Sequence, residues 1–402
     1  MARGRAALGE ALCLRRGEHD PQHRQSRASS LQICVVPAPG RCSGPFLRHR
    51  RSQLRRRDRD AAWRCVRHSS RLLQLAAPQQ IGAGGRKAGQ GDAAVTPIAI
   101  GIAGFGEIAR REHVAAIAAT DGLCLTAVAD PAGRHATVPV SASLEEMLAA
   151  HPEIQAVALC MPPSDRASAA RDAILAGRHV LLEKPPCATL AEAEALRELA
   201  SAEGVSLMTA WHSQEGAAVA AARDWLHGKT VRSVRVVWKE DVRVWHPGQA
   251  WIWTKGGFGV FDPGINALSI LTTILPGTLD VREAALRVPA NCATPIAASL
   301  SLEGEQGFSV SVELDFLQTG PQSWDIHIET DQGQALLSDG GNSLTVDGRP
   351  FAFPPQAEYP ALYARFAKLI RARKSDVDLE PLRLAEQALA KGRILLVEPF
   401  EE

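Results

Sequence analysis

Three polar side chains stand where the sequence restricts the backbone, and together they could move a proton. Asp262 and Asn266 lie four residues apart in V-F-D-P-G-I-N, where helical apolar spacing begins. Pro263 restricts Asp262 to extended or turn geometry, so we expect Asp262 at a helix entrance and Asn266 one turn further in. Lys184 follows H-V-L-L-E and precedes two prolines, where a cis bond can form. An ordinary helix cap and a solvated surface lysine are the plain alternatives to an acid–base or electrostatic site.

The residues around Lys184 alternate between expected strands and helices. Strands are expected at 97–103, 123–129, 156–160, 179–186 and 205–210, with helices at 104–119, 143–150, 166–177 and from residue 189. This alternation predicts a doubly wound parallel sheet, that is, a Rossmann domain over residues 96–215. Such sheets bind ligands beyond the carboxyl ends of their strands. The polar or turn residues that fall there are Pro162, Glu183, Lys184 and His212.

The turn after the first expected strand has the pattern of a dinucleotide site. Gly104, Gly106 and Ala109 form G-x-G-x-x-A, which permits a tight turn, the approach of a pyrophosphate and close helix packing. Asp130 ends the next strand, where it can bond ribose hydroxyls and repel a 2′-phosphate, so NAD is preferred, while Arg134 leaves NADP open. A glycine turn in an unrelated α/β unit is the alternative. The residues expected to bind the cofactor are Gly104, Gly106, Glu107, Ile108, Asp130, Met161, Pro162, Glu183 and Lys184.

Beyond residue 215 the alternation stops, and residues 216–402 are expected to form a substrate-binding α+β domain. Helices are expected at 217–226 and 361–373, and strands at 231–242, 296–302, 308–316 and 324–330. The alternating strands predict a large, mainly antiparallel open sheet with one free face. Such a face is compatible with a homo-oligomer, either a dimer or a tetramer.

Six of the eight tryptophans lie between Trp211 and Trp253, and most of them are expected to be core residues. Aromatic rings can also cover the C–H faces of a sugar while polar groups bind its hydroxyls. The segment K-E-D-V-R-V-W-H-P-G-Q-A-W-I-W mixes both kinds of side chain, although simple loop packing remains the alternative for His246. The residues expected to bind substrate are His212, Glu240, Trp245, His246, Asp262, Asn266 and Trp324.

Charge divides the chain: residues 1–95 carry 19 basic side chains against six acidic ones, and residues 96–402 carry 26 against 38. The basic stretch lacks sustained apolar periodicity, so we expect a disordered extension, or one that is not natively translated. A nucleic-acid-binding tail and an Arg-rich transit peptide are the alternatives. Because Met147 is the next methionine after Met1, a shorter product would need a non-AUG start, for which Val95 is a candidate.

The lack of C-x-x-C pairs, His-rich clusters and long apolar runs predicts no metal site, no membrane span and a reducing, cytoplasmic location.

Three motifs resemble those of the Gfo/Idh/MocA oxidoreductases: G-I-A-G-F-G-E-I-A, E-K-P-P and D-P-G-I-N. The segments W-K-E-D-V-R, W-H-P-G-Q-A-W-I-W and R-V-P-A-N-C resemble the branch of that family that oxidises sugars at C1. The resemblance covers roughly residues 97–400. It implies oxidation of the C1 hydroxyl of an aldopyranose to an aldonolactone, with hydride passing to NAD or NADP. D-galactose is favoured over L-arabinose and D-fucose by the resemblance only.

The resemblance also implies roles for the three polar side chains. Lys184 matches the family's catalytic lysine, and Asp262 with Asn266 matches its D-x-x-x-H pair, in which the histidine is the usual base. Because an amide does not titrate, we expect Asp262 to receive the proton, Lys184 to stabilise the oxyanion and Asn266 to orient the sugar. A deprotonated Lys184 remains an alternative base. A regulator that binds nucleotide and sugar without turnover, and another activity of the family on inositol or on glucose and fructose, are the competing functions.

Overall fold

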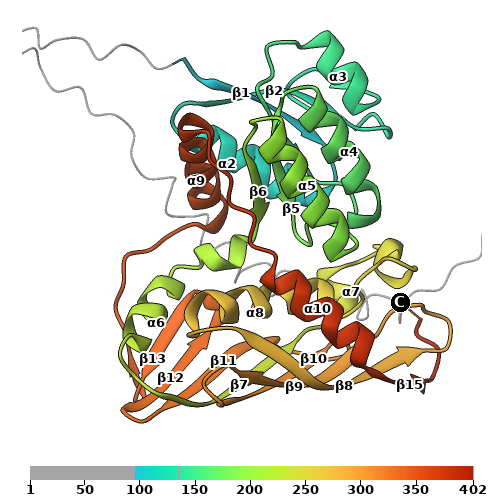
Figure 1. The fold of residues 1–402 in the computed structure, drawn as a ribbon. Helices are drawn as coiled ribbons and strands as arrows, with labels where there is room; N and C mark the ends of the chain where they lie inside the picture. The colour runs from blue at the N-terminus through green and yellow to red at the C-terminus, as the bar shows by residue number, and fades with distance from the viewer. Residues whose placement is uncertain (1–95, 135, 402) are drawn as a thin grey trace, which may run out of the picture. The chain divides into compact units, whose positions relative to one another are not determined.

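The structure is a computed structural model that describes residues 96–134 and 136–401 (Figure 1). The expectations for residues 1–95 therefore lie outside the described residues. Within the described ranges no helix is long and apolar enough to cross a bilayer.

The first half of the described chain forms a six-stranded sheet in the order β3-β2-β1-β4-β5-β6, and every pairing in it is parallel. Its strands are β1 (Ile98–Ala103), β2 (Leu123–Ala129), β3 (Val140–Ser141), β4 (Ala156–Leu159), β5 (His179–Glu183) and β6 (Leu207–Ala210). The helical segments between them are η2 (Ala109–His113), α2 (Val114–Ala119), α3 (Leu144–Ala150), α4 (Pro163–Leu175) and α5 (Leu190–Ala202). The predicted doubly wound parallel sheet is confirmed.

The strands of this sheet are short and almost wholly apolar because both faces are covered. In β4, Ala156 and Ala158 belong to one core cluster, and Val157 and Leu159 belong to the other. A capping box at Thr189 satisfies the first free backbone donors of α5 and fixes where that helix begins.

The helix expected at 104–119 is not α-helical throughout. Residues Ala109–His113 form a π-helical turn, η2, before α2 continues the helix. A π turn is rare and usually lies at a functional site. Here it ends at His113, a fully buried residue whose ring nitrogens bond Tyr363 and Glu183.

The second sheet has nine strands in the order β14-β13-β12-β11-β7-β10-β9-β8-β15. Its strands are β7 (Val231–Lys239), β8 (Leu279–Pro289), β9 (Ala297–Gly304), β10 (Ser309–Asp315), β11 (Ser323–Thr330), β12 (Gly333–Ser338), β13 (Ser343–Val346), β14 (Arg349–Pro350) and β15 (Arg393–Val397). The pairs β7–β10 and β8–β15 are parallel and the others antiparallel, so the predicted mainly antiparallel sheet is confirmed.

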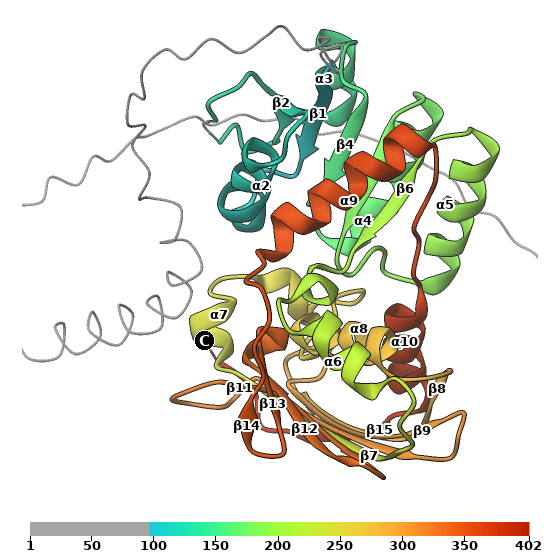
Figure 2. The same cartoon turned by 90° about the vertical axis from the view of Figure 1, so that its left-hand side faces the viewer.

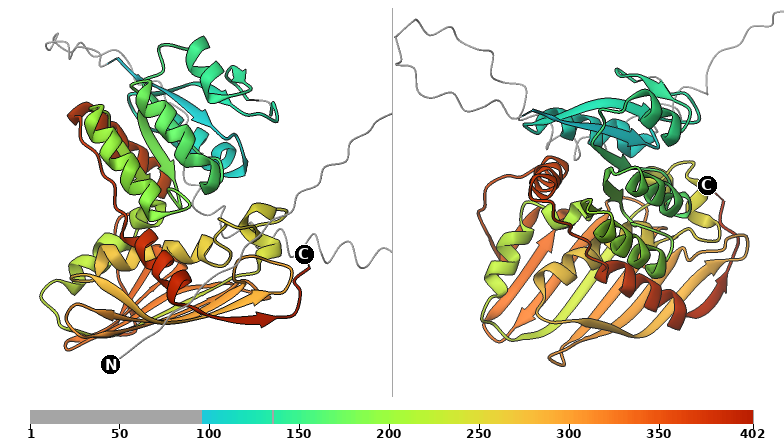
Figure 3. Two further views of the ribbon diagram at one scale, coloured as in Figure 1. Left: turned by 45° about the vertical axis from the view of Figure 1, so that its right-hand side comes forward. Right: turned by 45° about the horizontal axis from the view of Figure 1, so that its top comes forward.

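One face of this sheet is covered by helices, and the described residues place no helix on the other face (Figure 2 and Figure 3). The covering helices are α6 (Val219–Leu226), α8 (Phe261–Ile274) and α10 (Glu380–Lys391). Helix α8 lies so close to β10 that a Cβ at Gly264 would come within 2.5 Å of the Leu314 side chain. The glycine of D-P-G-I-N therefore lets the start of α8 sit against the sheet.

Helix α9 (Glu358–Ala372) follows all but the last strand of the second sheet in sequence but packs on the first sheet. Its apolar side, which includes Leu362, Phe366 and Ile370, shares a core cluster with β1 and with α2. Figure 2 shows α9 (orange-red) running along that face of the first sheet. The helix itself was expected, but its place beside the first sheet was not.

Candidate active site

Lys184 and Asp262 meet although they come from distant parts of the chain. Lys184 follows β5 directly, and its peptide bond to Pro185 is cis. Its Nζ donates to the Asp262 carbonyl oxygen at 2.9 Å and lies 3.1 Å from Asp262 Oδ1. Asp262 is the second residue of α8, with Asn266 one turn further on, so the predicted helix entrance is confirmed. The extended or turn geometry expected for Asp262 was wrong, because α8 already begins at Phe261 and Pro263 lies in its first turn. The side chains of the pair are only 14% and 5% exposed, which leaves a desolvated ion pair.

A histidine from the tryptophan-rich loop lies against the other oxygen of Asp262. His246 follows α7 (Val242–Trp245), and its Nδ1 lies 3.6 Å from Asp262 Oδ2. Its Nε2 lies 2.9 Å from Oε1 of Glu240, a buried residue that directly follows β7. Trp324 Nε1 donates to the second Glu240 oxygen at 2.8 Å. The charges therefore alternate along this row of side chains, from the ammonium of Lys184 to the carboxylate of Glu240.

His246 is charged more readily than an isolated histidine. Burial favours the neutral imidazole, but the hydrogen bond to Glu240 and the charges of Asp262 and Glu240 outweigh burial and raise the pKa of His246. Its Nδ1 is buried and has no hydrogen-bond partner among the described residues. The sequence suggested His246 as a sugar-binding residue, but no spacing linked W-H-P to D-P-G-I-N, so its contact with Asp262 was not foreseen.

Aromatic rings surround this row of polar groups. The rings of Trp245 and Trp324 are in edge contact with centroids 4.8 Å apart, and Trp238 lies 6.2 Å from Trp324. Phe316 packs 5.4 Å from the His246 ring. Of the six tryptophans between Trp211 and Trp253, only Trp211 and Trp238 are buried, so the expectation that most of them are core residues was wrong. Trp245 and Trp324 are half-buried and keep ring surface free for a ligand.

The glycine turn fits a dinucleotide. Gly104 has a φ of 85°, and a Cβ there would lie 2.5 Å from the backbone nitrogen of Met161, so the turn itself requires glycine. At Gly106 a Cβ would meet no atom within 4 Å, so protein packing does not explain that glycine. The open space at the start of the helix suits a pyrophosphate. Ala109 is fully buried, as close helix packing requires.

Asp130 directly follows β2, one residue beyond the predicted strand end, and its carboxylate is already occupied. It accepts hydrogen bonds from the backbone of Ala132 and Arg134, and from the Arg134 guanidinium at 2.8 Å. Burial would raise the pKa of Asp130, but the bonds from Arg134 and Ala132 outweigh it and lower the pKa. The Asp130 side chain is 2% exposed and that of Arg134 is 47% exposed, so the arginine is the part of this pair that solvent meets.

His212 engages α9 rather than Lys184. It lies in η3 (His212–Glu215), and its Nδ1 lies 2.6 Å from Glu358 Oε2. Its ring stacks on Tyr359 with centroids 5.1 Å apart. Its predicted role in substrate binding stays a prediction, as do the cofactor roles of Glu107, Ile108, Met161 and Pro162.

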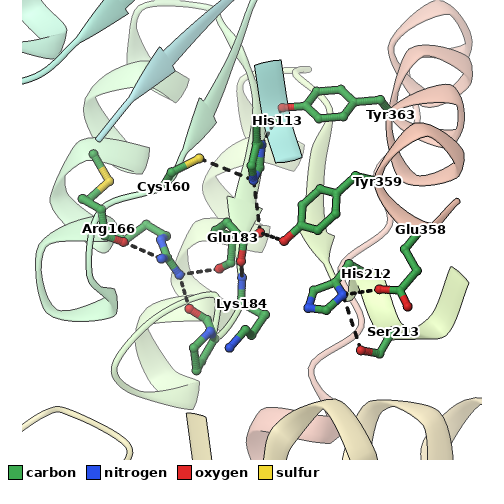
Figure 4. A network of polar contacts seen from close by, with 12 residues as sticks. His113, Cys160, Arg166, Glu183, Lys184, His212, Ser213, Glu358, Tyr359 and Tyr363 are labelled. Atoms are coloured by element: carbon green, nitrogen blue, oxygen red, sulfur yellow. Dashed lines mark hydrogen bonds and ion pairs between the residues drawn. The ribbon is translucent and has the colours of Figure 1, made fainter. Parts of the chain in front are cut away.

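Glu183 ends β5 and points into a buried network, not into solvent (Figure 4). One carboxylate oxygen accepts the backbone N–H of Lys184 at 2.6 Å. The other accepts the Tyr359 hydroxyl at 2.6 Å and faces His113 Nε2 at 3.1 Å. Sequence reasoning missed His113, Tyr359 and Tyr363, the last of which bonds His113 Nδ1 at 2.7 Å.

A signal for His113 was present in the sequence. Ala109, His113, Ala116 and Ile117 have the spacing of one apolar helix face, so a histidine among them is buried and needs a partner. The identity of that partner was not readable, because Tyr363 is 250 positions away in the chain.

Comparison with known proteins agrees with this architecture. Residues 98–211 match the model of the Gfo/Idh/MocA family, which is described as "Oxidoreductase family, NAD-binding Rossmann fold". Galactose 1-dehydrogenase of Pseudomonas fluorescens is 45% identical over 306 residues, which span 76% of this chain and 99% of that protein. The crystal structure of D-galactose-1-dehydrogenase from Rhizobium etli is 48% identical, covers 77% of this chain and 100% of its own, and superposes with a TM-score of 0.74.

A more distant structure shares the fold. KijD10, a 3-ketoreductase from Actinomadura kijaniata solved with TDP-benzene and NADP, is 19% identical and has a TM-score of 0.65 over 75% of this chain. The chain belongs to the Gfo/Idh/MocA oxidoreductase family, as its motifs predicted.

Proposed function

We propose that this chain is an NAD(P)-dependent aldose 1-dehydrogenase that oxidises the C1 hydroxyl of D-galactose to the lactone, and accepts L-arabinose and D-fucose. The observation that carries the proposal is the desolvated contact between Lys184 and Asp262, with Glu240 and His246 in one row behind it. The two galactose 1-dehydrogenases at 45% and 48% identity support galactose as the substrate.

The oxidation removes a hydride from C1 and a proton from the C1 hydroxyl group, and the site residues have different roles in these two losses. A dinucleotide held through its pyrophosphate at the glycine turn would supply, in its nicotinamide ring, the acceptor for the C1 hydride. Asp262 takes the proton of the C1 hydroxyl as the carbon–oxygen double bond forms. Lys184 stabilises the negative charge that develops on that oxygen, and it does so in a shielded environment where an ammonium group is most effective. Asn266, one helical turn from Asp262, donates to a sugar hydroxyl.

The remaining polar groups suit a polyhydroxyl ligand. Glu240 and His246 offer an acceptor and a donor beside Asp262, while Trp245 and Trp324 offer ring surface for the C–H face of the pyranose. Galactose and arabinose share their configuration at C2, C3 and C4, so this set of groups can bind either sugar. The difference lies in the hydroxymethyl group at C5.

We infer that NAD is preferred and NADP is tolerated. The Asp130 carboxylate at the end of β2 favours free ribose hydroxyls and repels a 2′-phosphate. The half-exposed Arg134 guanidinium reduces that repulsion, because it lies on the carboxylate and is a phosphate partner itself.

A substrate scan tests the function. The full chain is assayed for nicotinamide reduction with D-galactose, L-arabinose, D-fucose, D-glucose and myo-inositol, each with NAD and with NADP, and the product is trapped as the hydroxamate of a lactone. We expect the highest kcat/KM with D-galactose and NAD. Reduction with myo-inositol or glucose alone would assign another activity of the family. Absence of reduction with galactose, arabinose and fucose would overturn the proposal.

A further inference from the structure

The buried network behind Lys184 has the features of a device that positions this lysine. We propose that Glu183, His113 and Tyr359 are positioning residues for Lys184, and that α9 thereby holds the lysine against Asp262. This inference deepens the proposed function, in which Lys184 acts at C1 of the sugar.

The Glu183 carboxylate is ionised although it is buried. Burial would raise its pKa, but the hydrogen bond and charge of His113, with further contributions from His212 and Tyr359, lower the pKa of Glu183 to about 2. One of its oxygens receives the backbone N–H of Lys184 at 2.6 Å, a short charge-assisted bond. A fixed negative charge therefore holds the main chain of the lysine itself.

Two further groups fix that carboxylate from its other side. The Tyr359 hydroxyl donates to Oε1 at 2.6 Å, and His113 Nε2 lies 3.1 Å from the same oxygen (Figure 4). His113 is held in turn by the Tyr363 hydroxyl at 2.7 Å from Nδ1. Tyr359 and Tyr363 both come from α9, one turn apart, and they are the two tyrosines of the chain.

The carbonyl groups that flank Lys184 are held by a second buried charge. The Arg166 guanidinium, on α4, donates to the carbonyl oxygens of Glu183 and Pro185 and also to that of Met161. The backbone on both sides of Lys184 is thus clamped by one anion and one cation. Only the conformation of the four-carbon side chain of Lys184 is then free, and the Nζ atom at its end bonds Asp262.

Stability alone is a poor explanation for this network. A buried ion pair such as Glu183 with His113 commonly contributes no more than apolar residues of the same volume would, so its presence here needs another reason. Its position supplies one, because the chain of bonds ends at the backbone of the lysine. A displacement of about 1 Å in a reacting group can cost on the order of a hundredfold in rate.

The test compares Tyr359→Phe with two variants on the same helix. Tyr359→Phe removes one hydroxyl from Glu183, and Tyr363→Phe removes one from His113, a step further from the lysine. Phe366→Leu removes buried apolar volume from α9 but contacts none of these groups through a hydrogen bond, so it controls for weaker packing of the helix. We expect kcat with D-galactose to fall about ten- to a hundredfold in Tyr359→Phe and less in Tyr363→Phe, with little change in the Kd for NAD.

A second readout needs no turnover. An amine-reactive reagent is applied to the protein without cofactor, and the labelling rate of Lys184 is measured by mass spectrometry relative to the exposed Lys255. We expect Lys184 to label several-fold faster in Tyr359→Phe than in the unaltered chain, and at the unaltered rate in Phe366→Leu. If no aldose is oxidised by the unaltered chain, the proposed function fails, and the labelling still decides the positioning role. Unchanged labelling in Tyr359→Phe, or equal changes in Phe366→Leu at equal thermal stability, would overturn the inference.

Discussion

Replacing Asp262 with asparagine tests which group receives the C1 hydroxyl proton. The change keeps the shape of the side chain but removes a negative charge 3.1 Å from Lys184 Nζ and 3.6 Å from His246 Nδ1. An asparagine cannot accept the proton, and general-base catalysis is worth about 10²–10⁴-fold. We therefore expect kcat to fall by that factor, which corresponds to about 3–5 kcal/mol in the activation free energy.

The assay is steady-state reduction of NAD by D-galactose across a pH series, with Lys184→Met as the companion variant. If Asp262 is the base, Asp262→Asn loses the whole general-base factor, while Lys184→Met loses only the stabilisation of the oxyanion. If Lys184 is the base, the two variants exchange these patterns. Turnover of Asp262→Asn within about tenfold of the unaltered chain would refute the assignment of the base, since it lies below the range for general-base loss.

Asp241→Asn is the matched control for this experiment. Asp241 lies next to Glu240 in the same loop, and its carboxylate caps α7 by accepting the Arg243 N–H at 3.0 Å. Asparagine caps a helix as well as aspartate does, so the same chemical change should leave kcat nearly unaltered. Measurement of the Kd for NAD in each variant separates loss of chemistry from loss of the cofactor site.

Two further predictions concern charges around the site. Arg134→Leu removes the cation that lies on Asp130, so we expect kcat/KM with NADP to fall about tenfold or more while that with NAD changes less, as measured with both cofactors. The pKa of His246 is raised in the folded chain, so its ion pairs stabilise the fold fully below the ordinary histidine value of 6.5 and are lost as the pH rises through the folded value. The unfolding free energy of the unaltered chain, relative to His246→Phe in urea, should therefore shrink as the pH rises above 6.5.

Each of these two predictions has an outcome that contradicts it. Equal losses of kcat/KM with NAD and with NADP in Arg134→Leu would mean that the guanidinium stabilises the turn after β2 and does not select the cofactor. A difference in unfolding free energy that is constant with pH would mean that His246 contributes through packing on Phe316 and not through its charge.

The sequence predicted the elements whose signal is local. The parallel sheet followed from short apolar strands separated by amphipathic helices, and Asp262 at the entrance of α8 followed from the proline after it. The order of strands in the second sheet, with β7 and β10 in parallel, depends on which distant segments pair, and periodicity carries no such information.

For the site, too, the sequence indicated single residues but not the contacts between distant segments. Lys184, Asp262 and Asn266 could be chosen because each stands in a restricted local setting, and the structure brings Lys184 and Asp262 together. The contacts of His246 with Asp262 and of Tyr359 with Glu183 join segments without a common motif, so no local pattern could reveal them.

The packing of α9 against the first sheet bears on how the chain is synthesised. The ribosome delivers β1 to β6 first, and α9 emerges only after all but the last strand of the second sheet. Until then, one apolar face that includes Ile100 and Ile102 lacks the helix that covers it in the finished protein. The parallel sheet therefore receives one of its covering helices from a part of the chain that is made after most of the second sheet. A fragment cut near residue 215 would lack α9 and would expose that face.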